Sequence, residues 1–209
     1  MPNRTLFTLF SCALITFSST PCAQGGPPKS CAYDRARLLA LNESQFDQDM
    51  AGGWRALVSR PGCGLVAADL LHDYREANAD ASGLLFWHEA QIRAEAGQYP
   101  QAITLMKRAY KPVDKDNAGW NPYVDATIAF LRRDRAALQQ AQTKLAAVQP
   151  PVRAGIPPVI DGYMEVDMDD GSKANIRWPP NIDVVEGLVN CFGKPYNEAY
   201  TDVCRQSKP

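Results

Sequence analysis

The hydrophobic and polar positions in the middle of the chain follow the spacing of two consecutive helices. In the segment 81–112, mostly apolar residues recur every three or four positions, as they do along one face of an amphipathic helix. The pattern is present both before and after Gly97. The faces carry Leu85, His88 and Ile92, then Tyr99, Ala102, Ile103, Met106 and Tyr110. Gly97 can end the first helix, and Pro112 ends the second because it lacks a backbone donor. The segment therefore predicts a helix, a turn and a second helix.

Weaker helical patterns precede this pair, and a clear one follows it. Helices are expected at 33–42 and at about 65–77, and a further pair is expected on either side of Asp134. The apolar residues of that pair are Val124, Ile128 and Leu131, then Leu138, Ala141, Leu145 and Val148. Asp134 lies 37 positions after Gly97 and is expected to take the same turn position. Because this offset is only slightly longer than a repeat of about 34 residues, it suggests an internal repeat.

The last third of the chain has a different pattern. Prolines in the segment 150–158 exclude a helix and favour an extended linker. Alternating residues in 160–178, with a turn at Asp170 and Gly171, predict a β-hairpin. The segment 181–205 returns to helical spacing and is interrupted at Gly193, so a final helix pair is expected there.

Small and aromatic residues of the central pair resemble those of a tetratricopeptide repeat. They are Gly97, Tyr99, Ala102 and Ala109, with Ala90 in the first helix. The chain departs from the family where Trp87 is shifted by about one position, where Arg93 replaces a common aromatic residue, and where Pro112 comes early. The resemblance covers about 81–148 and implies an all-α fold of antiparallel helix pairs stacked as a short tetratricopeptide-like array. The whole is similar to an uncharacterised family of secreted bacterial proteins.

The first 23 residues have the pattern of a secretory signal peptide. Arg4 supplies the basic start, and the apolar run 6–17 is too short to span a bilayer of about 30 Å. Cleavage is expected after Ala23. The alternative is lipoprotein processing before Cys22, which Ser19 and Pro21 disfavour. We expect residues 24–209 to form a single helical domain, periplasmic or secreted, with 160–178 as its hairpin insert and no stable membrane insertion.

Cysteine usage agrees with export to an oxidising compartment. Four cysteines remain after removal of the signal peptide, namely Cys31, Cys63, Cys191 and Cys204. Of the three connectivities that four cysteines allow, we favour Cys31 with Cys63 and Cys191 with Cys204, since each pair ties one end of the helical array. The second pair requires a long connecting loop or a bent helix. A zinc site is disfavoured because the cysteines are widely spaced and have no neighbouring histidine.

Charge and motifs argue against several function classes. The formal net charge is −1 and the isoelectric point is about 6.1, which gives no electrostatic basis for nucleic-acid binding. His88 and Glu89 resemble half of a zinc-peptidase helix, but Ile92 stands where the second histidine is needed. The acidic run before Gly171 lacks the spacing of a calcium loop. We therefore predict no catalytic residue, no metal and no cofactor.

The resemblance implies recognition of a protein or peptide, since stacked helix pairs form a concave surface lined by the first helix of each pair. The positions expected on that surface are Trp87, Gln91, Glu95 and Arg132, although Trp87 is equally compatible with core packing. The alternative is an inhibitor or immunity-type protein whose acidic hairpin, 160–178, plugs a basic cleft. An enzyme that uses scattered carboxylates is a third alternative. The sequence does not indicate the oligomeric state.

Overall fold

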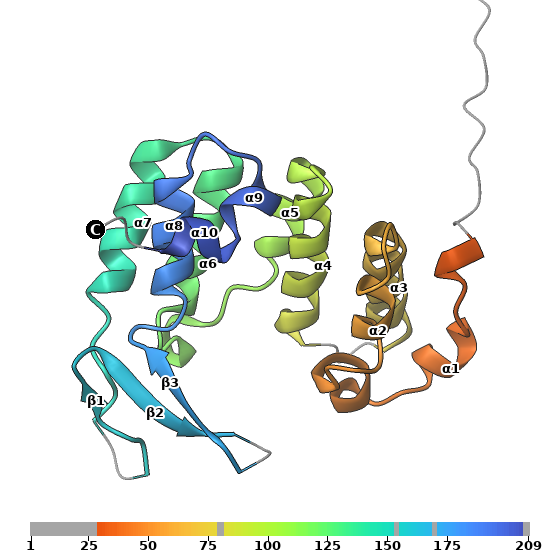
Figure 1. Ribbon diagram of the computed structural model, residues 1–209, viewed down its shortest axis with the longest axis horizontal. Helices are drawn as coiled ribbons and strands as arrows, with labels where there is room; N and C mark the ends of the chain where they lie inside the picture. Colours follow the sequence, from red (N-terminus) through yellow and green to blue (C-terminus); the bar gives the residue numbers. More distant parts are fainter. Residues whose placement is uncertain (1–28, 79–81, 153–154, 169–170, 207–209) are drawn as a thin grey trace, which may run out of the picture.

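The computed structural model describes residues 29–78, 82–152, 155–168 and 171–206. These residues are mostly helical, with a small antiparallel sheet near the C-terminus. In Figure 1 the helices extend from α1 at one end to α7 and α8 at the other, and the sheet lies below the α7–α8 end. The predicted helical character and the hairpin are confirmed. The predicted signal peptide lies outside the described residues.

Short helices precede the first long one. Their bounds are Lys29–Cys31 (η1), Arg35–Leu39 (α1), Ser44–Gln48 (η2, a single π-helical turn), Arg55–Val58 (α2) and Gly64–Ala77 (α3). Asp34 begins α1 by accepting a hydrogen bond from the backbone N–H of Arg37, at 3.0 Å. A disulfide between Cys31 and Cys63 joins the first turn to the residue before α3. The long helix α3 is therefore covalently tied to the start of the described chain.

The central region contains two helix pairs at about the expected places, but the second helix of the first pair ends at Met106 and not, as expected, at Pro112. The pairs are Gly83–Glu95 (α4) with Tyr99–Met106 (α5), and Trp120–Leu131 (α6) with Arg135–Ala146 (α7); the 3-10 turn Val113–Lys115 (η3) lies between the pairs. Each pair turns at one residue with left-handed backbone, Gly97 (φ 77°) in the first and Arg133 (φ 59°) in the second. The prediction that Asp134 would match Gly97 is therefore wrong by one position. Asp134 instead caps α7 by accepting from the N–H of Ala137.

Arg133 can hold a conformation that costs a non-glycine residue about 1 kcal/mol because its side chain is anchored. The guanidinium donates to the backbone carbonyls of Phe192 and Lys194, at 2.5 and 2.9 Å. Both acceptors follow helix Ile182–Asn190 (α8), so the α6–α7 turn is fastened to the C-terminal part of the chain.

The sheet has one more strand than expected. Its strands are Val159–Ile160 (β1), Tyr163–Asp167 (β2) and Lys173–Arg177 (β3), in the order β1-β2-β3 with antiparallel pairing throughout. The register pairs Met164 with Ile176 on one face and Tyr163 with Arg177 on the other. Met164 is buried, whereas Ile160, Tyr163 and Ile176 are exposed. The predicted turn falls partly on residues outside the described part.

The final helix pair is broken. After α8 come two four-residue helices, Tyr196–Ala199 (α9) and Asp202–Arg205 (α10), instead of one continuous helix. This break brings Cys204 to within 5.9 Å of Cys191, measured between Cα atoms, and the two form a disulfide. The structure thus contains the two disulfides that the sequence analysis favoured, and the bend that the second one requires.

Helix α4 lies between two hydrophobic clusters. Leu85 and Ile92 belong to the cluster formed with α2 and α3, whereas Trp87, Ala90 and Ala94 belong to the cluster formed with α5, α6 and α8. The two sets alternate along α4, so opposite faces of one helix are buried. Packing of α4 therefore joins the N-terminal and C-terminal parts of the described chain.

Candidate functional site

Three of the four predicted binding residues lie on α4, but they have different surroundings. Trp87 is only 3% exposed, and its ring centroid lies 5.1 Å from that of Trp120 and 4.9 Å from that of Tyr123. Gln91 is half-buried, and Glu95 is exposed at the end of the helix. The accessible side of α4 therefore presents Gln91 and Glu95, with Trp87 packed beneath it.

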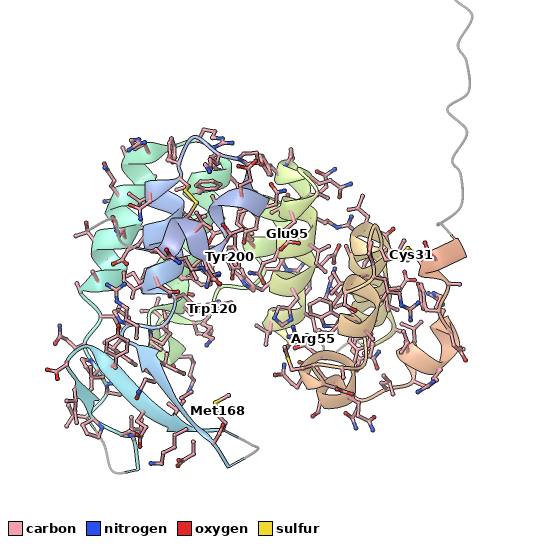
Figure 2. All side chains as sticks on the ribbon, viewed as in Figure 1. Cys31, Arg55, Glu95, Trp120, Met168 and Tyr200 are labelled. Atoms are coloured by element: carbon pink, nitrogen blue, oxygen red, sulfur yellow. A yellow bond between two sulfur atoms is a disulfide. The ribbon has the colours of Figure 1, made fainter. Side chains whose placement is uncertain are left out.

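The C-terminal segment docks on this side of α4. Gln91 Nε2 donates a hydrogen bond to the hydroxyl of Tyr200, at 2.9 Å, and the hydroxyls of Tyr123 and Tyr200 lie 3.2 Å apart. The backbone N–H of Tyr196 donates to the hydroxyl of Tyr99, and the Tyr196 side chain is fully buried. Figure 2 labels Tyr200 and Glu95, which lie between the C-terminal helices and α4. A short segment of the same chain is therefore already held at the predicted binding surface.

The junction of α4 and α9 disfavours negative charge. Burial raises the pKa of Glu95, although much of this side chain is exposed. Burial and the neighbouring Tyr200 hydroxyl raise the pKa of Tyr123 and of Tyr196. The hydroxyls of Tyr123 and Tyr196 therefore stay protonated and can act as hydrogen-bond donors at all physiological pH values.

Arg132, the fourth predicted residue, lies elsewhere. It lines a cavity of about 450 Å³ between α5, α6 and α7. The floor is formed by one branched and three small side chains, which are Ile128, Ala129, Ala137 and Ala141. Trp87, Gln91 and Glu95 are not among the lining residues, so the structure does not bring Arg132 together with the other three.

A buried carboxylate that sequence analysis did not single out lies beside His88. Asp47 is fully buried, accepts a hydrogen bond from Trp54 Nε1 at 2.8 Å, and lies 2.6 Å from His88 Nδ1. Burial alone would raise the pKa of Asp47, but the hydrogen bonds from His88 and Trp54 and the charge of Arg55 outweigh it, so the pKa is lowered. Because the carboxylate is ionised, the imidazole Nδ1 is the donor.

The Asp47–His88 pair fastens η2 to α4 and has no nucleophile beside it in the described residues. The His88 side chain forms no hydrogen bond with a serine or cysteine there, and the four described cysteines form disulfides. The contact joins η2 to α4. The two residues are 41 positions apart, so no local spacing could have indicated their contact.

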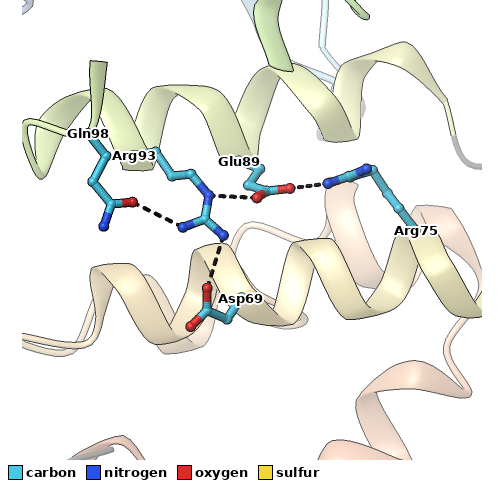
Figure 3. Close-up of polar contacts among 5 residues, drawn as sticks. All are labelled: Asp69, Arg75, Glu89, Arg93 and Gln98. Atoms are coloured by element: carbon cyan, nitrogen blue, oxygen red, sulfur yellow. Dashed lines mark hydrogen bonds and ion pairs between the residues drawn. The ribbon is translucent and has the colours of Figure 1, made fainter. Parts of the chain in front are cut away.

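A second buried charge network lies between α3 and α4 (Figure 3). Glu89 pairs with both Arg75 and Arg93, and Arg93 also donates to Asp69 and Gln98, at 2.9 and 3.0 Å. Arg93 thus forms an ion-pair contact between α4 and α3. Since both oxygens of Glu89 are occupied by guanidinium groups, this carboxylate is not available to a metal or a substrate.

Some of the carboxylates in the acidic hairpin, 160–178, are paired with a cation. Asp161, Glu165 and Asp167 are exposed, but Lys173 forms an ion pair with Glu165 and lies 3.9 Å from Asp167. Asp169 and Asp170 lie outside the described residues. The hydrogen bond to Glu165 raises the pKa of Lys173, which keeps that ammonium charged beside the acidic strand.

Metal-ligand geometry, helix length and similarity to known proteins point to no particular function. In the described part of the chain, no group of three or more His, Cys, Asp or Glu side chains could hold a metal ion. None of the described helices is long and apolar enough to cross a membrane. No protein-family model matches the chain, and no similar protein was found among the curated proteins or the solved structures. The functional proposal therefore rests on the geometry of this chain.

Proposed function

We propose that the protein is an exported tetratricopeptide-like module that binds a protein or peptide partner on the accessible side of α4. The contact of Gln91 with Tyr200 is the observation that carries this proposal, because the same surface already holds the short helix α9. Two successive helix pairs, each turning at one left-handed residue, support a tetratricopeptide-like arrangement of α4 to α7. The two disulfides are compatible with an exported protein.

The surface is held in one arrangement before any partner arrives. The Cys191–Cys204 disulfide fixes the segment that carries Tyr200, and Tyr123 and Gln91 hold the Tyr200 hydroxyl from two different helices. A partner that contacts Gln91 and Glu95 therefore meets a surface whose side chains are already ordered, which lowers the entropic cost of binding.

A crosslinking pull-down from the envelope of the native host tests this proposal. The bait variant carries Gln91→Ala and Glu95→Lys, and a matched control carries the same changes at exposed positions of α7 and α3, Gln139→Ala and Glu76→Lys. We expect a partner that is captured by the wild type and by the control but lost by the bait variant. A partner captured equally by all three folded proteins, or by none, contradicts the proposal.

A second candidate is an inhibitor or immunity-type protein, favoured by the position of the hairpin outside the helical body (Figure 1). In that function Asp161 and Asp167 would meet cations in a partner's cleft. The test compares Asp161→Asn/Asp167→Asn with Glu76→Gln/Asp114→Asn, which removes the same charge elsewhere. Salt-sensitive partner binding that only the hairpin variant loses supports the inhibitor. Insensitivity of binding to the hairpin variant supports the α4 surface.

A further inference from the structure

We propose that the cavity between α5, α6 and α7 binds a small apolar carboxylate. This site is separate from the α4 surface of the proposed function and rests on the cavity alone. Its volume of about 450 Å³ lies within the range of small-ligand sites, which is about 300–1,000 Å³.

The floor of the cavity is suited to an aliphatic or aromatic group. Ala129, Ala137 and Ala141 are small residues on facing sides of α6 and α7, and their size leaves the space that a longer side chain would fill. Ile128, only 5% exposed, completes the apolar surface beside them. An aliphatic or aromatic group placed there would bury its own apolar surface against these side chains, which favours binding.

Three cations line the cavity. They are Lys107, which directly follows α5, Arg132, which directly follows α6, and Lys144 within α7. None of them forms an ion pair with a carboxylate in the described residues. Arginine is well suited to a carboxylate because its planar guanidinium donates two parallel hydrogen bonds. The cations therefore lack the partner that an anionic ligand would provide.

The two carboxylates on the rim already have partners. Asp125 accepts a hydrogen bond from the Tyr110 hydroxyl at 2.5 Å, and Asp134 accepts from the N–H of Ala137 at 2.9 Å. Burial and the contact with Asp125 raise the pKa of Tyr110, so its hydroxyl remains a donor to that carboxylate. Three cations and two carboxylates leave one net positive charge. This balance fits a monoanion, such as a carboxylate, better than a phosphate dianion.

A free organic acid and the C-terminal residue of a peptide share this chemistry. The test titrates the exported protein, with both disulfides formed, with 4-methylpentanoate and with its amide. A parallel titration uses acetyl-Ala-Ala-Leu with a free or an amidated C-terminus. Backbone NMR shifts report the site. We expect saturable shifts at α5 to α7 with a free carboxylate, and binding of the amide weaker by about tenfold or more.

Two matched pairs of variants locate the site. Arg132→Gln removes the guanidinium, with Arg37→Gln as the control at another exposed arginine; Ala137→Leu fills the cavity, with Ala136→Leu as the control one position away. We expect each first variant, but neither control, to weaken binding by about tenfold. Binding of only the peptide acid identifies a chain end as the source, and binding of only the small acid identifies a free metabolite.

Some outcomes overturn the inference. They are equal binding of acid and amide, full binding by Arg132→Gln and Ala137→Leu, or no saturation by either acid at millimolar concentration. None of these results bears on partner capture by the α4 surface, so the two proposals fail separately.

Discussion

Arg75 and Glu89 form an ion pair between α3 and α4 in which the side chains are only 6% and 3% exposed. The pair is drawn in Figure 3. Removing one partner of such a pair leaves a buried charge without compensation, which costs about 3–5 kcal/mol. We therefore expect Glu89→Leu to lower the free energy of unfolding by about this amount. Urea denaturation monitored by circular dichroism measures the change.

The double variant Arg75→Leu/Glu89→Leu supplies the internal control. It removes both charges and should be more stable than Glu89→Leu alone, because apolar pairs often replace buried ion pairs at little cost. Asp69→Asn breaks only the contact of Arg93 with an exposed carboxylate and should cost less than about 1 kcal/mol. Equal losses in Glu89→Leu and Asp69→Asn would show that the network is not buried in solution.

Periodicity located the helices whose packing is regular. α3, α4, α6 and α7 lie close to the expected ranges because their apolar residues recur every three or four positions without interruption. For the final pair the sequence predicted one helix after α8, but the structure has the two short helices α9 and α10. The bend between them brings Cys204 back to Cys191, which one straight helix would not do. β1 escaped notice because two residues cannot show alternation.

Helical periodicity could predict only part of the candidate site. Gln91 and Glu95 are four positions apart on a helix, so spacing alone places them on one side of α4. Their neighbour Tyr200 comes from 109 positions beyond Gln91, and a contact of that kind leaves no periodic signal. The cations Lys107 and Lys144 were missed for the same reason, because only folding brings α5 and α7 to one cavity.

Replacing Tyr200 by Phe tests how firmly the C-terminal segment is held. The change removes the hydroxyl that joins Gln91 and Tyr123 and leaves both without this partner. We expect a loss of about 1–2 kcal/mol in the free energy of unfolding. Tyr33→Phe is a suitable control, because the Tyr33 side chain is also half-buried but its hydroxyl forms no hydrogen bond with any described residue. Equal effects in the two variants would contradict a holding role for the Tyr200 hydroxyl.

Stability should fall in acid through Asp47. Its pKa in the folded protein lies below the ordinary 3.8, so the ionised form stabilises the fold. This contribution is fully present above the ordinary pKa and is lost as the pH falls through the folded pKa. We expect Asp47→Asn to be less stable than the wild type at pH 7 and to lose less stability between pH 5 and pH 2, measured by urea titrations.

The effect of pH on stability through Glu95 should be opposite to that through Asp47. Its pKa is raised from 4.5 in the folded protein, so protonation favours folding, and the wild type gains this contribution as the pH falls through the raised pKa. Glu95→Gln should therefore be no less stable than the wild type at pH 7. A variant that lost stability there, as Asp47→Asn does, would show that the Glu95 carboxylate is favourably paired.

The two disulfides should differ in their contribution to stability. Each constrains the unfolded chain, and the entropic cost of closing a loop grows with its length. Sequence separations of 32 for Cys31–Cys63 and 13 for Cys191–Cys204 lead us to expect a larger loss for the first. Cys31→Ala/Cys63→Ala should lose about 0.8 kcal/mol more than Cys191→Ala/Cys204→Ala, each losing about 3–4 kcal/mol in urea denaturation. A larger loss for the C-terminal pair would mean that it acts mainly in the folded protein, by holding Tyr200 against α4.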